Sequence, residues 1–93
     1  MSDEAYDVTD NPAESRFEVV VDGVTGYLEY KRSKRLLALV HTEVPEAIGG
    51  RGIAFALVRH GFETARQEGR RVVPLCPVAK VFLKRYPEYE ELV

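Results

Sequence analysis

Alternating apolar and polar positions mark the first structured part of the chain. In residues 15–21, SRFEVVV, every second residue from Phe17 onward is apolar, as in a half-buried strand. The Asp22-Gly23 dipeptide predicts a tight hairpin turn. Residues 24–31, VTGYLEYK, then predict the returning strand, with Leu28 and Tyr27 on opposite faces. The pattern therefore predicts an antiparallel β-hairpin.

A continuous apolar run and a helical period follow the hairpin. Residues 36–41, LLALVH, are apolar on both faces, which is typical of a central strand. From Ile53 onward the apolar residues recur at spacings of three and four, which predicts an amphipathic helix. Gly69 is placed to end this helix.

A second strand and a second helix complete the pattern. Residues 71–75, RVVPL, predict a short strand, and Pro77 is suited to open a helix that ends at about Arg85. A strand, a helix and a strand in succession predict a parallel β-α-β unit. The expected fold class is therefore α/β (α+β): antiparallel hairpin strands, a β-α-β unit and a short C-terminal helix.

Charge divides the chain into two unequal parts. Five of the fifteen acids and none of the thirteen bases fall in residues 1–14, so this segment is expected to be a disordered acidic leader. Residues 15–93 then form a single domain that carries three more bases than acids. This mild excess suits a small anionic ligand and does not favour nucleic acid as a partner.

Composition also limits location and metal chemistry. No apolar run approaches the roughly 20 residues that span a bilayer, and the N-terminus lacks the features of a secretory signal. The single cysteine, Cys76, fits a reducing compartment. We therefore expect a cytoplasmic protein without a membrane partner. We also expect no metal site, because a structural zinc would have only one cysteine and the nitrogen ligands His41 and His60.

Three glycines precede the predicted helix. Gly49, Gly50 and Gly52 lie where a backbone can curl around phosphate oxygens, and the helix N-terminus offers unsatisfied N–H groups and a positive dipole end. A pyrophosphate is the anion most suited to such a turn. The alternative is a tight turn that merely needs glycine.

Two prolines predict a gap beside this turn. Pro45 follows the central strand and Pro74 lies late in the next one, and proline cannot donate to a sheet ladder. The two parallel strands are therefore expected to splay at their C-terminal ends. The gap would expose the backbone of Thr42, Glu43, Val44, Leu75 and Cys76. A linear amide arm in the gap and a pyrophosphate on the turn together describe coenzyme A.

The same residues resemble a known family. Ala47-Ile48-Gly49-Gly50-Arg51-Gly52 resembles the acetyl-CoA-binding motif of the GNAT acyltransferases, Arg/Gln-x-x-Gly-x-Gly/Ala, with alanine at the first position. The segments HTEVP, GGRGIA, VVPLCP and RYPEY, in this order, are similar to the short stand-alone N-acetyltransferase domain-containing proteins over residues 16–90. The resemblance implies an acetyl-CoA-dependent N-acetyltransferase. It implies cofactor contacts by Thr42, Glu43, Val44, Gly49, Gly50, Arg51, Gly52, Ile53 and Ala54, to which Lys80 adds a candidate phosphate contact.

Two residues are candidates for the chemistry. Cys76 precedes Pro77 and would cap the last helix, at the positive end of the helix dipole, so it is a candidate nucleophile; the alternative is a small buried packing residue. His41 lies beside the expected gap and is a candidate general base; the alternative is a structural histidine. The tyrosine that many GNAT members use as an acid is replaced by Leu83.

The acceptor is the least determined part. The resemblance implies an amine, either a small molecule or a protein lysine or N-terminus. Because the chain lacks elements that build the acceptor pocket in longer GNAT members, an alternative is a non-catalytic module that binds CoA or acetyl-CoA and acts with a partner. A small sheet has exposed edge strands that can pair with a second copy, so a homodimer is a further alternative.

Overall fold

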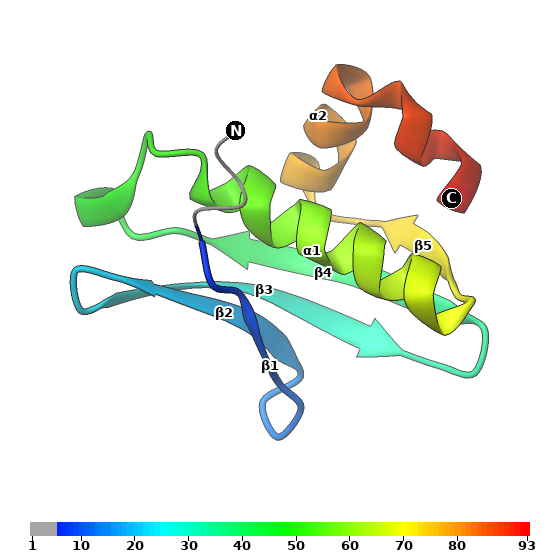
Figure 1. The fold of residues 1–93 in the computed structure, drawn as a ribbon, viewed down its shortest axis with the longest axis horizontal. Helices are drawn as coiled ribbons and strands as arrows, with labels where there is room; N and C mark the ends of the chain where they lie inside the picture. The colour runs from blue at the N-terminus through cyan, green and yellow to red at the C-terminus, as the bar shows by residue number, and fades with distance from the viewer. Residues whose placement is uncertain (1–5) are drawn as a thin grey trace.

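The computed structural model describes residues 6–93, which form one five-stranded sheet with helices on one side (Figure 1). The strands are β1 (Thr9–Asn11), β2 (Arg16–Val21), β3 (Val24–Arg32), β4 (Leu36–Glu43) and β5 (Arg71–Pro74). They lie in the order β1-β2-β3-β4-β5. Neighbours pair antiparallel except β4 and β5, which pair in parallel. The sequence-based prediction of a hairpin followed by a β-α-β unit is confirmed.

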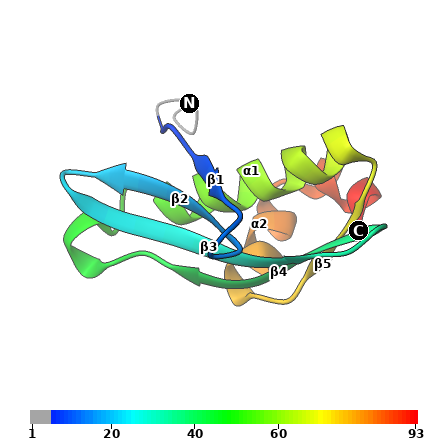
Figure 2. The same ribbon diagram turned by 90° about the horizontal axis from the view of Figure 1, so that it is seen from below.

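Two α-helices cover one face of the sheet. The helices are α1 (Ile53–Glu68) and α2 (Pro77–Arg85), and two short 3₁₀ helices, η2 (Glu46–Ile48) and η3 (Pro87–Leu92), follow β4 and α2. Phe62 of α1 stacks on Phe82 of α2 with ring centroids 5.6 Å apart, so the two helices lie on the same side. Figure 2 shows this layering, with the sheet seen nearly edge-on below α1. Within residues 6–93 no helix is both long and apolar enough to cross a membrane.

The core lies between the helices and one face of the sheet. Phe17, Leu28, Leu37 and Leu39 are fully buried beneath α1, whose Leu57, Val58 and Phe62 are fully buried in turn. The opposite face of β4 carries no helix, and Leu36 is 44% exposed there. β4 is an interior strand with β3 and β5 on either side, as predicted. Its apolar side chains, however, are covered by helices on one face of the sheet only.

Positive backbone angles explain the turns at the ends of these elements. Asp22 and Gly23 have φ of 52° and 76°, which is the conformation of a two-residue hairpin turn with a right-handed twist. Gly69 has φ of 68° and ends α1, as its position in the sequence predicts.

The predicted disordered leader is wrong for the part of it that the structure describes. Residues 9–11 form β1 on β2, and Tyr6 and Val8 pack against the core. The acidic character of this segment does not prevent ordering, because the Tyr30 hydroxyl donates to Asp10 Oδ1 at 2.6 Å and Arg32 lies 3.6 Å from Asp10 Oδ2. Residues 1–5 lie outside the described part of the chain.

Candidate functional site

The parallel strands β4 and β5 separate at their C-terminal ends, as the sequence predicts. Their pairing ends at Leu39 and Pro74, whereas β4 continues to Glu43 and pairs there with β3 only. The Leu39 carbonyl is the last acceptor on this side and takes the N–H groups of both Leu75 and Cys76, each at 3.0 Å. Beyond Leu39, one edge of β4 is therefore free of strand pairing within the described chain.

The cause of this gap differs from the predicted one. Arg71 and Leu75 both donate their N–H toward β4, so the alternation of a parallel ladder turns the missing N–H of Pro74 to the outer edge. Pairing stops instead because Pro77 begins α2 and carries the chain away from the sheet. Pro45 lies after the end of β4, where it caps η2.

A β-bulge in β4 decides which side chains line the gap. Glu29 pairs with His41 and Tyr30 with Leu39, so Val40 is an extra residue without a partner on β3. The extra residue reverses the alternation, and Thr42 instead of His41 faces α1. Accordingly Thr42 is half-buried and His41 is exposed.

Cys76 lies on the α1 side of the gap. It is the N-cap residue of α2, followed by Pro77, as predicted. Its Sγ is 3.4 Å from the Thr42 Oγ1, and the residue is 1% exposed. The thiol is therefore enclosed between β4 and α2, which is the position of the packing alternative.

His41 lies on the other side of the sheet and pairs with a carboxylate. Its Nε2 is 3.0 Å from Glu43 Oε1, and both side chains are 52% exposed. The structure thus brings together His41 and Glu43, but it separates His41 from Cys76 by the thickness of the sheet. The bulge that causes this separation leaves no mark in the apolar pattern of residues 36–41.

The glycine turn joins η2 to α1 and fits an anion. Gly50 and Gly52 have φ of 73° and 78°, and a Cβ added to either would meet no atom within 4 Å. Their glycine is therefore required by the backbone angle, and the space around them is open. The first turn of α1 holds no acidic side chain, so its free N–H groups and positive dipole end are not neutralised locally.

The remaining cofactor candidates differ in what they can offer. The side chain of Ile53 is buried, since the residue is 1% exposed. Gly49 has no side chain and an ordinary φ of −71°. These two residues can therefore offer a ligand their backbone groups only. Ala54 follows in the first turn of α1, and Val44 follows β4. Lys80 lies in the first turn of α2, and its exposed side chain makes no hydrogen bond or ion pair with another described residue.

Two residues outside the predicted site, Tyr6 and Asp22, hold the turn through Arg51. The Tyr6 hydroxyl donates to the Arg51 carbonyl at 2.7 Å, and the Arg51 guanidinium lies 3.0 Å from Asp22 in the β2–β3 turn. Arg51 is therefore already paired through its side chain. Sequence reasoning missed Tyr6 because it lies in the segment predicted to be disordered, and no local signal links it to the turn.

Comparison with known proteins agrees with this geometry. Residues 16–92 match the family model described as GCN5-related N-acetyl-transferase. The solution structure of a GCN5-like candidate N-acetyltransferase from Staphylococcus aureus superposes with a TM-score of 0.68 at 21% sequence identity. The match covers 92% of this chain and 85% of that one. At this identity the structural likeness shows a common fold.

Proposed function

The chain belongs to the GCN5-related N-acetyltransferase family, and from this premise we propose that it transfers the acetyl group of acetyl-CoA to a primary amine. One observation carries the proposal: a β4 edge that loses its partner at Leu39 leads to a glycine turn with two positive φ angles at the start of α1. The free edge suits an amide arm, and the turn suits a pyrophosphate.

The donor-binding residues follow from this arrangement. The backbone of Gly50, Gly52 and Ala54 would hold the pyrophosphate, and the unpaired edge of Thr42 and Glu43 would hold the amide arm. Lys80 is available to a phosphate because it has no partner among the described residues. When bound, acetyl-CoA supplies an acetyl group that is activated as a thioester.

The proton of the attacking amine would go to His41. A carboxylate can only accept, so Glu43 fixes the proton of the imidazole on Nε2 and leaves Nδ1 free to take one. The amine nitrogen then forms the new bond to the acetyl carbon as the bond from that carbon to sulfur breaks. Glu43 orients the ring and stabilises the imidazolium that results.

Direct attack by the amine suits the structure better than a route through Cys76. A nucleophile has to reach the thioester, and the Sγ of Cys76 is enclosed beside Thr42. The face of the sheet that carries His41 has no helix over it within residues 6–93, so the acceptor would approach from there (Figure 2).

The first test is binding and turnover on the same sample. Titration calorimetry with acetyl-CoA should give saturable binding, and amines should release free CoA thiol in its presence. His41→Gln should lower kcat with little change in acetyl-CoA affinity. Cys76→Ala should retain turnover, and intact mass should show no acetyl adduct on the wild-type chain. Binding without turnover would leave the non-catalytic module, and no binding at millimolar acetyl-CoA would refute the proposal.

A further inference from the structure

Glu29 differs from the other half-buried glutamates of the described chain. Taken as whole residues, three glutamates are half-buried: Glu18, Glu29 and Glu63. Glu18 accepts from Arg16 at 2.6 Å, and Glu63 accepts from the Tyr89 hydroxyl at 2.7 Å. Glu29 makes no hydrogen bond or ion pair with another described residue. Of these three, Glu29 is therefore the one whose carboxylate oxygens have no described partner and can accept from a ligand.

The cation directly opposite Glu29 on the sheet is directed elsewhere. Arg16 is the cross-strand neighbour of Glu29 on β2. Its guanidinium is bonded to Glu18, and its Cζ lies 4.3 Å from the centre of the Tyr27 ring. Among the described residues, neither Arg16 nor Lys31, the next β3 residue on the same face, forms an ion pair with the Glu29 carboxylate.

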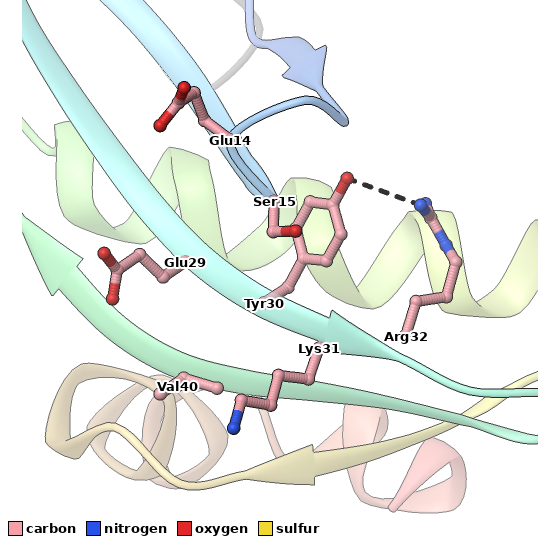
Figure 3. A pocket seen from close by; sticks show the side chains of 7 residues that line it. All are labelled: Glu14, Ser15, Glu29, Tyr30, Lys31, Arg32 and Val40. Carbon is pink, nitrogen blue, oxygen red and sulfur yellow. Dashed lines mark hydrogen bonds between the residues drawn. The ribbon is translucent and has the colours of Figure 1, made fainter.

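Glu29 also lines a hollow at the bulge. The hollow has a volume of about 530 Å³. Figure 3 shows Glu29 and Lys31 extending away from Tyr30 and Arg32, with Val40, the bulge residue, between them on the neighbouring strand. Val40 follows Leu39, the last β4 residue that pairs with β5, so the hollow adjoins the inner end of the β4–β5 gap.

The same face carries the proposed base. Glu29 and His41 are direct cross-strand partners, and both side chains point to the face away from α1. Directly opposite residues have Cβ atoms about 5 Å apart. An ammonium held by Glu29 would therefore lie within reach of the His41 ring.

We propose that Glu29 binds the protonated amine of the acceptor, and that the acceptor is a cationic alkyl amine which enters from this face of the sheet. The inference rests on the proposed function and names the substrate class of that site. Glu29 holds the ammonium, and His41 accepts its proton before attack. A neutral arylamine has no charge for Glu29 to hold and would gain nothing from it.

The kinetic test compares two amines on the full chain. Benzylamine is cationic at pH 7.5, and aniline is neutral. Glu29→Gln should raise the KM for benzylamine about tenfold and leave the KM values for aniline and acetyl-CoA unchanged. Glu88→Gln, which removes an exposed carboxylate on η3, is the matched control and should change none of them. An equal loss for both amines, or no loss for benzylamine, would overturn the proposal.

A binding test separates this inference from the proposed function. Benzylammonium titrated into ¹⁵N-labelled protein without acetyl-CoA should shift the amide signals of residues 28–31 and 40–41. Glu29→Gln should abolish these shifts. If the shifts occur while no amine is acetylated, the proposed function fails and the ammonium site stands. If the wild-type chain shows no such shifts, the site is refuted even where turnover is observed.

Discussion

Thr42 and Cys76 bridge β4 and α2 at the point where the backbones have stopped pairing, with Oγ1 and Sγ 3.4 Å apart. The contact closes the α1 side of the gap and leaves the other side to His41. It exists because the bulge at Val40 turns Thr42 inward, and because Cys76 caps a helix that starts directly after β5. In the proposed reaction, the side from which the acceptor approaches therefore depends on this pair.

Truncation of Cys76 should affect stability more than turnover. Cys76→Ala leaves a small cavity in a buried site, which should lower the free energy of unfolding by about 1 kcal/mol in urea denaturation. Thr42→Val replaces the hydroxyl with a methyl group of similar size. A double-mutant cycle should give a coupling of about 0.5 kcal/mol or less, because a thiol is a weak hydrogen-bond partner. A turnover loss above a hundredfold in Cys76→Ala would restore the nucleophile hypothesis.

The glycine turn offers a matched pair of substitutions. Gly52→Ala and Gly69→Ala place a Cβ at φ of 78° and 68°, with no atom within 4 Å in either case. Each should cost about 1–2 kcal/mol of stability through the left-handed backbone. Only Gly52→Ala should also weaken acetyl-CoA binding in calorimetry, because Gly69 lies at the opposite end of α1. Equal affinity in both variants would show that the turn does not hold the ligand.

Tyr6 should position the turn for its ligand. The C=O and N–H of a trans peptide point in opposite directions, so the Tyr6 bond to the Arg51 carbonyl orients the N–H of Gly52 away from Tyr6. Tyr6→Phe should weaken acetyl-CoA binding about three- to tenfold and leave the affinity for S-acetylpantetheine, which lacks the pyrophosphate, unchanged. Tyr86→Phe is the control. Loss of both affinities together would indicate a general structural role.

His60 should make stability depend on pH near neutrality. Burial lowers the pKa of His60 below its usual 6.5, against a smaller opposing effect of Asp10, and the ring lies edge-on to Phe17 at 4.9 Å. The unfolded state then binds more protons than the folded state, so stability is lost as pH falls through 6.5 toward the folded pKa. The melting temperature should fall between pH 7.5 and 5.5, and less so in His60→Gln.

His41→Gln is the control for that experiment, because it removes an exposed imidazole and leaves the half-buried His60 ring in place. A wild-type melting temperature that stays constant over this range would contradict the assignment, as would an unchanged slope in His60→Gln.

Local sequence signals predicted the elements well for identifiable reasons. The Asp22-Gly23 turn, the helical period from Ile53 and the glycine at position 69 each depend on backbone angles or spacing within a few residues. The same holds for Cys76 as an N-cap, since Pro77 directly after it suits the first helical position. The gap was also predicted, although the departure of the chain at Pro77 causes it rather than the missing N–H of Pro74.

What the sequence by itself determined is the order of the elements, the parallel unit and the glycine turn before α1, because these follow from periodicity and from residues with restricted φ. Tertiary structure alone decided that Val40 is a bulge, that His41 and Cys76 lie on opposite faces, and that Glu29 stands beside His41 without an ion pair among the described residues. It also decided that Tyr6 reaches the turn. Register and long-range contacts depend on how distant segments pack together, and no short window of sequence contains that information.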